Sequence, residues 1–154
     1  MKKKWLELLC SLAVSLGTGG LAGSLVAGSM EQYESMYKPP LAPPGWVFPV
    51  VWTILYILMG IAAWLIYRSG SPEKKSALKW YLAQLAVNAV WPVLYFRARA
   101  YWVAFFWLLL LWYLVFETIR KFARISREAA WLMIPYLAWI TFAGDLNLAV
   151  ALHG

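Results

Sequence analysis

Long apolar runs alternate with short polar segments along the chain. Each run is about 20 residues long, which is the length that an α-helix needs to cross the hydrocarbon core of a bilayer. Apolar and polar residues do not alternate within the runs as they would in a transmembrane β-strand. The pattern predicts an all-α membrane protein, a single domain over residues 1–154 formed by a bundle of five transmembrane helices. The expected spans are about 5–27, 48–67, 78–96, 101–119 and 129–152.

The first apolar run follows three lysines, a layout that a secretory signal peptide shares. The run is longer than the apolar part of a signal peptide, so we expect a retained helix. Its second half is rich in glycine, and Gly19 and Gly23 form a small-xxx-small pair that allows close helix approach. Packing within the monomer is the simpler interpretation of this pair, and a dimer face is the alternative.

A polar segment at about residues 29–47 joins the first two runs. The stretch from Tyr33 to Trp52 holds five of the eight prolines of the chain. Proline fixes φ, lacks an N–H and moves the preceding residue out of the α region. Residues 38–45 are therefore predicted to form a stiff, non-helical lid loop over one end of the bundle.

The remaining polar segments are short. Basic loops are expected at 68–76 and 120–128, and a tight turn at 97–99. We expect Pro135 to interrupt the last run, because proline breaks the hydrogen-bond ladder of a helix. Glu117 lies near the end of its run, where it is expected to pair with Arg120 or Lys121.

The composition supports lipid as the solvent of this chain. Hydrophobic residues make up 63% and charged residues 14%, too few polar side chains to cover a soluble domain of this size. The formal charge is +7, and eleven of the fourteen Lys and Arg lie at the N-terminus and in segments 68–79 and 120–127. Such clusters suit anionic headgroups better than nucleic acid, so no nucleic-acid partner is expected. The positive-inside rule then places the N-terminus in the cytoplasm and the C-terminus outside.

Among the polar side chains inside the predicted spans, Asn88, Asp145 and Asn147 are the most notable. The two amides can hydrogen-bond across the bundle, and interhelical contact is at least as good an interpretation as ligand binding. Asp145 points more strongly to function, since a carboxylate at membrane depth costs about 2.5–3.5 kcal/mol on insertion scales. We expect it to face a wet cavity or to be neutral.

The chain contains eleven tryptophans. Four of them lie at span ends, where amphipathic rings prefer the membrane interface: Trp5, Trp80, Trp102 and Trp131. Trp52, Trp91 and Trp139 lie deeper. A flat aromatic ligand under the lid loop would stack on Trp52 and Trp139, and simple packing is the alternative interpretation.

Motifs of conventional enzymes do not occur. The sequence has no phosphate loop, no HExxH and no GxSxG. One cysteine and one histidine, Cys10 and His153, exclude a disulfide framework and a Cys/His metal cluster within one chain. Any chemistry would have to use tryptophan, a carboxylate or a bound molecule.

Three blocks of sequence are specific in their order and spacing: YESMYKPPLAPPGW at 33–46, VNAVWPVLYF at 87–96 and IPYLAWITFAGDLN at 134–147. Together with the five spans and the many tryptophans, these blocks resemble the TspO/translocator protein family. This family is also known as tryptophan-rich sensory protein or peripheral benzodiazepine receptor. The resemblance covers nearly the whole chain. It implies a five-helix bundle with a ligand pocket under the loop between the first two helices, and a homodimer.

The same resemblance implies ligands and pocket residues. The ligands are porphyrins and related tetrapyrroles, such as protoporphyrin or haem, and isoquinoline or benzodiazepine compounds; no cofactor is required. In bacterial relatives, two pocket tryptophans that match Trp52 and Trp139 support light-dependent breakdown of protoporphyrin. By motif, the pocket residues are Tyr33, Pro43, Pro44, Trp52, Asn88, Trp91, Trp139, Ala143 and Leu146.

The sequence departs from the family pattern at several positions. Gln32 stands where the family often has tryptophan, and Leu41 where it often has an aromatic residue. The end of the chain lacks the tyrosine and the basic residue of the proposed cholesterol motif, so a high-affinity sterol site is not expected. Asp145 stands where many relatives have small or hydroxyl residues, which predicts a more polar pocket floor.

Three functions follow as hypotheses. The leading one is a membrane receptor or transporter that binds tetrapyrroles under the lid loop and supports their photochemical degradation. The second is a small proton-coupled transporter with Asp145 as the relay. The third is a regulatory membrane subunit without a small ligand.

Overall fold

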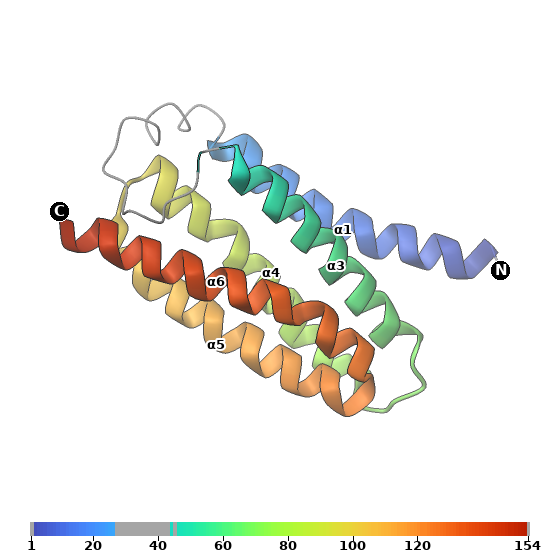
Figure 1. The fold of residues 1–154 in the computed structure, drawn as a ribbon. Helices are drawn as coiled ribbons and strands as arrows, with labels where there is room; N and C mark the ends of the chain where they lie inside the picture. Colours follow the sequence, from blue (N-terminus) through green and yellow to red (C-terminus); the bar gives the residue numbers. More distant parts are fainter. Residues whose placement is uncertain (1, 27–43, 45, 154) are drawn as a thin grey trace.

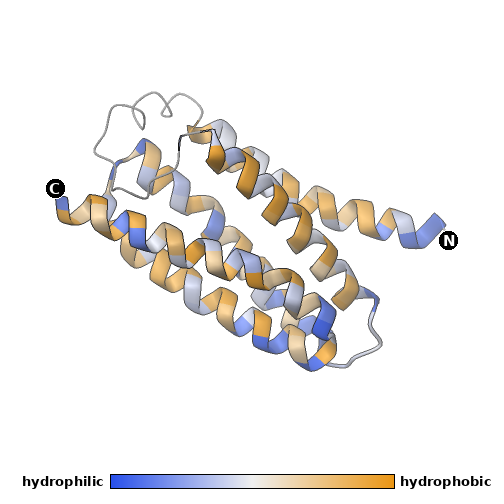
Figure 2. Ribbon diagram, viewed as in Figure 1, coloured by the Kyte–Doolittle hydropathy of each residue, from blue (hydrophilic) through white to orange (hydrophobic). Residues whose placement is uncertain are grey.

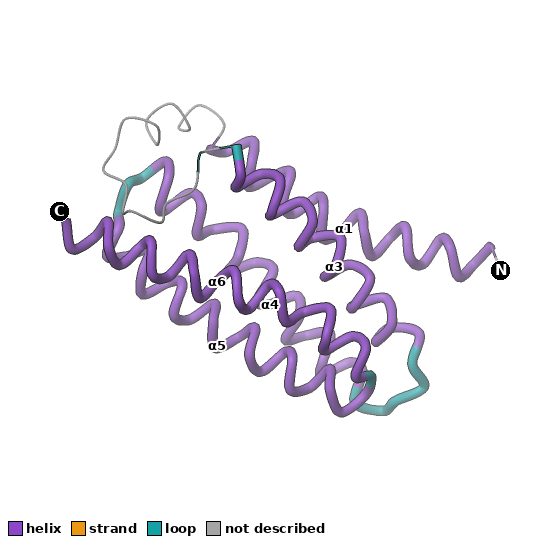
Figure 3. Tube along the Cα trace, in the orientation of Figure 1, coloured by secondary structure: helices purple, strands orange, loops and turns teal. Residues whose placement is uncertain are grey.

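The computed structural model describes residues 2–26, 44 and 46–153, and all its secondary structure within them is helical. The connections at 69–73 and 98–100 are short (Figure 3). The elements are α1 (Lys2–Val26), α3 (Val47–Arg68), α4 (Lys74–Pro92), the π-helix η2 (Val93–Arg97), α5 (Tyr101–Ile125) and α6 (Arg127–His153). The predicted all-α bundle is confirmed. Of the expected lid loop, most residues, including Tyr33 and Pro43, lie outside the described part of the chain.

The helices form an elongated bundle with the two termini at opposite ends (Figure 1). α6 packs against α5 and α3, while α1 packs against α3 and α4. The N-terminus of α1, the turn at 69–73 and the junction of α5 with α6 lie at one end, which we call the basic end. The turn after η2, the C-terminus and the start of α3 lie at the other end.

Four of the helices are long and apolar enough to cross a membrane: α1, α3, α5 and α6. Hydrophobic residues cover much of their length (Figure 2), and many of the large hydrophobic side chains are exposed. α4, with 19 residues, is long enough but less apolar than these four. It carries lysines in its first turns and the buried amides Gln84 and Asn88 further on. Its crossing of the bilayer, and thus the fifth span, stays a prediction.

The predicted loop at 120–128 is wrong. α5 continues to Ile125, and Ser126 alone separates it from α6. The segment contains neither glycine nor proline, and Phe122 is fully buried, so packing extends the helix beyond the apolar run. Ser126 Oγ accepts the N–H of Ala129 at 3.2 Å and caps the start of α6.

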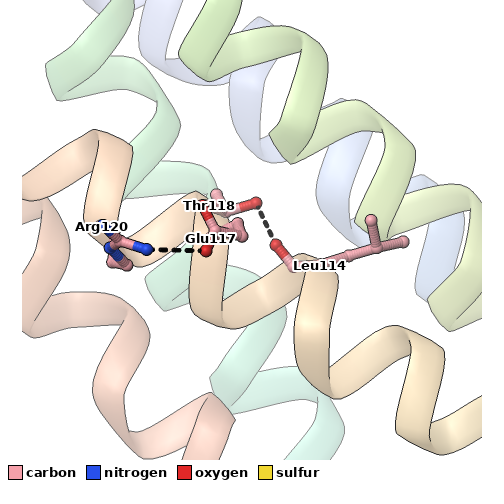
Figure 4. Close-up of polar contacts among 4 residues, drawn as sticks. All are labelled: Leu114, Glu117, Thr118 and Arg120. Carbon is pink, nitrogen blue, oxygen red and sulfur yellow. Dashed lines mark hydrogen bonds and ion pairs between the residues drawn. The ribbon is translucent and has the colours of Figure 1, made fainter.

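Charged side chains near the end of α5 behave as expected. Arg120 pairs with Glu117 at 3.0 Å, one turn apart on the outer surface (Figure 4). The neighbouring Thr118 donates to the carbonyl of Leu114 at 2.7 Å (Figure 4). The pair is exposed at the Arg120 side, so it adds little stability.

Pro92 and Pro135, which lie inside the third and fifth apolar runs, differ in their effect on the helix. α6 runs unbroken through Pro135, so the predicted interruption is wrong. A membrane helix tolerates such a proline, because neighbouring groups satisfy the carbonyl that the missing N–H leaves free. At Pro92, in contrast, α4 ends and the chain passes into η2. The expected tight turn follows, with Arg99 at a positive φ of 52°.

Small residues set the contact between α1 and α3. A Cβ at Gly19 would overlap the ring of Tyr56, and one at Gly60 would lie 2.8 Å from side-chain atoms of Leu12 and Ser15. Ser15 donates to the carbonyl of Tyr56 at 2.8 Å, and Ser11 donates to that of Gly60 at 2.7 Å. Gly19 thus packs within the monomer, the simpler of the two interpretations.

We expect Gly60→Ala to lower the thermal unfolding midpoint in detergent, because the methyl group meets the backbone of Leu12 as well as side chains. Overpacking of this kind costs about 1–3 kcal/mol. The matched control is Gly17→Ala in α1, where a Cβ meets nothing within 4 Å. An unchanged midpoint for Gly60→Ala would mean that the two helices are not held this closely.

Candidate ligand-binding site

A cavity of about 520 Å³ lies between α1 and α3, near the end of the bundle opposite the basic end. Its walls are the last three turns of α1, the first turns of α3, and Pro92 and Phe96 at the end of α4 and in η2. Pro44 and Trp46, which lead into α3, are exposed beside this end. The cavity therefore lies where the predicted lid loop begins and ends.

Glycine forms the α1 wall of the cavity. A Cβ at Gly20 or Gly23 would meet no atom within 4 Å, so each position borders open space. Leu16 and Val26 line the two ends of this wall. The glycine-rich stretch thus removes side chains where the cavity needs room and leaves a flat surface of backbone.

Aromatic rings form the opposite wall. The Trp52 ring stacks on Tyr56, with centroids 5.7 Å apart, and meets Trp139 edge-on at 6.4 Å. Phe48 contacts Trp139 at 5.8 Å and Phe96 at 5.5 Å, both edge-on. Trp52 and Phe48 line the cavity, while Trp139 forms a second layer behind them. The two tryptophans singled out from the sequence are thus in contact, and one of them reaches the cavity.

A chain of buried polar groups lies behind the aromatic wall. Tyr56 donates a short hydrogen bond to Asn88 Oδ1, and Asn88 Nδ2 donates to the hydroxyl of Tyr136 at 2.6 Å. Tyr136 in turn donates to Gln84 Oε1 at 2.7 Å. We call these four residues the tyrosine–amide network. It joins α3, α4 and α6, which favours interhelical contact as the role of Asn88.

Sequence reasoning missed three members of this network. Gln84 lies one turn before Asn88 on the same face of α4, Tyr56 one turn after Trp52, and Tyr136 three residues before Trp139. Helical spacing from residues already singled out was the signal that pointed to them.

Trp91 and Asn147 form a second polar contact. Trp91 Nε1 donates to Asn147 Oδ1 at 3.0 Å, and Asn147 Nδ2 donates to the carbonyl of Tyr101 at 2.9 Å. This ties α4 to α6 and to the start of α5. Ala143 and Leu146 are buried on α6 nearby in sequence, and none of these residues lines the cavity.

Asp145 lies away from the cavity. Its side chain is exposed on the outer face of α6, in a shallow groove shared with Leu108 and Trp112 of α5. The expectation of a polar pocket floor at this position is therefore wrong. A helix turns about 100° per residue, so the burial of its neighbours Leu146 and Asn147 leaves Asp145 facing outward.

We expect Tyr136→Phe to destabilise the protein by about 1–3 kcal/mol, because it leaves buried groups of Asn88 and Gln84 without a partner. Chemical unfolding in detergent measures the change. Tyr113→Phe, which removes a hydroxyl from an exposed side chain of α5, is the control and should change little. Equal stability of the two variants would show that the network contributes nothing.

Comparisons with known proteins agree with the fold and with the sequence blocks. The chain matches the model of the TspO/MBR family over residues 10–152. It is 33% identical to the tryptophan-rich protein TspO of Chlorobaculum tepidum, over 97% of each chain. It is 36% identical to the translocator protein of Ovis aries, over 96% of this chain and 89% of that protein. It is also 36% identical to the tryptophan-rich sensory protein of Cereibacter sphaeroides, over 96% of this chain and 90% of that protein. Together with the long apolar helices, these matches show that the chain is an integral membrane protein of the TspO/MBR family.

Proposed function

We propose that the protein is a membrane receptor whose cavity between α1 and α3 binds porphyrins and related tetrapyrroles. Flat isoquinoline and benzodiazepine compounds would enter the same cavity. The observation that carries the proposal is the pairing of a glycine wall with an aromatic wall across about 520 Å³. Such a slot favours flat aromatic ligands over bulky ones, because a planar ring contacts both walls at once.

One end of the cavity provides a cation for the carboxylates of a tetrapyrrole. A planar macrocycle would stack on Trp52 and lie along Gly20 and Gly23. Arg97 reaches from η2 to the carbonyl of Leu25 at 3.5 Å, next to the rim of the cavity. Its guanidinium is therefore available to a propionate group at the mouth, since arginine binds carboxylates in a planar, bidentate manner.

The lid loop is part of this proposal. Tyr33, Pro43 and Pro44 would close the cavity over the ligand, as the resemblance implies. Prolines restrict the free loop, so ordering it on closure costs less entropy. Asn88, Trp91, Ala143 and Leu146 act from behind the aromatic wall, where they fix the helices that carry it.

Contact between Trp52 and Trp139 provides a route for photochemistry. In the proposed step, one electron passes from the indole of Trp52 to the photoexcited porphyrin, which gives an indole radical cation and a porphyrin radical anion. Trp139, 6.4 Å away, then reduces Trp52 again. The radical cation is then on Trp139, and the porphyrin radical anion passes its electron to dissolved dioxygen, which gives superoxide. The Trp139 radical cation next oxidises the porphyrin to its radical cation, which combines with superoxide. Dioxygen is thereby added to the ring, and both tryptophans are restored.

Titration of the detergent-solubilised protein with protoporphyrin, in the dark and then under light, tests both steps. Wild-type protein should show saturable quenching of tryptophan fluorescence and a light-dependent product. Trp139→Phe should keep most of the binding and lose most of the product, whereas Trp52→Phe should weaken both. Trp131→Phe, at an outer position with 70% of its surface exposed, is the control and should retain both.

Further variants decide between the hypotheses. Asp145→Asn should leave binding and product unchanged, and loss of proton-driven uptake in this variant would favour the transporter instead. If Trp52→Phe/Trp139→Phe degrades porphyrin as well as wild type does, the chemistry is not in this cavity. Absence of saturable binding for every tetrapyrrole and isoquinoline tried would favour a regulatory subunit.

We also infer that the basic end faces the cytoplasm, and that the protein forms the homodimer that the resemblance implies. In a Cys10→Ser background, an impermeant maleimide added to intact bacterial cells should label Arg99→Cys and not Ser71→Cys. These residues lie in turns at opposite ends of the bundle. The reverse labelling pattern would contradict the orientation.

A further inference from the structure

A second opening, of about 490 Å³, lies at the basic end of the bundle, far from the cavity at the other end. Successive turns of α1, from Lys3 to Val14, form one side of this groove. Trp64 of α3 and Tyr81 of α4 lie on the other side. The N-terminal half of α1 diverges there from the ends of the other helices (Figure 1). We call this opening the basic-end groove.

Two residues that line the basic-end groove carry buried hydrogen-bond donors without a partner among the described residues. The donors are the indole N–H of Trp64 and the hydroxyl of Tyr81, whose side chain is only 3% exposed. Ser15, which donates to the carbonyl of Tyr56 at 2.8 Å, is a neighbour of Tyr81 but does not lie in hydrogen-bonding geometry with its hydroxyl. Buried donors in native proteins are nearly always paired, so two of them beside one groove indicate a missing acceptor.

Cations surround the outer part of the groove. Two cations lie near the Trp64 ring. The Arg68 guanidinium is 5.0 Å from the ring centre, and the Lys4 ammonium is 5.8 Å from the ring centre. Lys3 lines the groove directly, and Glu7 is the acid that lines it, one helical turn further along α1. The cations outnumber this carboxylate, so the entrance suits an anionic group.

The rest of the lining is largely apolar. Leu6 and Val14 on α1 and Leu82 on α4 are exposed along the groove. With a rise of 1.5 Å per residue, Trp64 lies about 6 Å from Arg68 along α3, and Tyr81 lies about 10 Å from the start of α4. From the end of the bundle inward, the cations come first and the neutral donors second, and the apolar lining begins beside the donors and continues to Val14.

We propose that the basic-end groove binds one anionic glycerophospholipid from the adjacent leaflet. Such a lipid has the same order of groups: a phosphate, then ester carbonyls that accept hydrogen bonds, then acyl chains. The phosphate pairs with Lys3, Lys4 and Arg68. The side chains of Trp64 and Tyr81 shift on binding so that their donors reach an ester carbonyl, and one chain follows the apolar lining. A free fatty acid lacks the separate phosphate and ester levels, so it fills only part of this pattern.

Native mass spectrometry of delipidated protein in a mild detergent, with dioleoyl phosphatidylglycerol and dioleoyl phosphatidylcholine as probes, tests the proposal. Wild-type protein should retain one phosphatidylglycerol in preference to phosphatidylcholine. Tyr81→Phe removes one donor and should bind phosphatidylglycerol about fivefold more weakly, the effect of one hydrogen bond. Its lipid-free form should be at least as stable as wild type, because the hydroxyl that it loses has no protein partner.

A charge variant separates the headgroup contribution. Lys3→Gln/Lys4→Gln/Arg68→Gln should lose the preference for phosphatidylglycerol. Lys121→Gln is the control, since Lys121 lies over the Trp80 ring and does not line the groove. The proposal is overturned if wild type binds both lipids equally, if Tyr81→Phe and the triple variant bind as wild type does, or if oleic acid displaces the lipid at equal concentration. Porphyrin binding should be unchanged in Tyr81→Phe, so this experiment tests the lipid site independently of the porphyrin site.

Discussion

The tyrosine–amide network fixes the centre of this bundle, and the remaining packing depends on it. Between helices in a membrane, the hydrophobic effect contributes little, so close packing and interhelical hydrogen bonds hold the elements together. Each hydrogen bond of the network joins groups from different helices, and α3, α4 and α6 all take part. Because all four residues are buried, a wrong rotation of any of these helices would leave polar groups unpaired.

The middle of α1 contacts α3 closely, and an opening lies beside each end of the helix. Ser11 and Ser15 donate to carbonyls of α3, and Gly19 and Gly60 allow the two helices to touch. Beyond Gly19, the glycines of α1 border the cavity, and from Lys3 to Val14 the helix forms one side of the basic-end groove. One helix therefore provides a wall of both openings, and contacts in its middle separate them.

The apolar runs predicted where the helices lie but not which face of each helix is buried. The apolar runs sufficed for the bundle, and the family blocks pointed to Trp52 and Trp139, which are in contact. In lipid, however, the outward face of a helix is as apolar as the inward face, so the sequence does not reveal which side is buried. For this reason Asp145 was expected to face the cavity although it lies outside, and the tyrosine partners of Asn88 were not foreseen.

The junction of α5 with α6 was predicted wrongly, for a related reason. The cluster of basic residues at 120–128 was interpreted as a loop. Long Lys and Arg side chains extend to the interface while their backbone stays helical, so charge marks the membrane boundary and not the end of a helix. The segment contains no glycine or proline that would have ended α5 earlier.

Tyr56 connects the structural and the functional parts of the molecule. Its hydroxyl belongs to the network, its carbonyl accepts from Ser15, its ring lies against Gly19, and Trp52 stacks on it. A change at Tyr56 would disturb the fold and the cavity together, so a loss of binding there would carry no information about the ligand. Trp52 is attached to the same framework by ring contacts alone among the interactions found for its side chain. Its indole is thus free to exchange a packing contact for a ligand contact while the hydrogen bonds of the bundle stay intact.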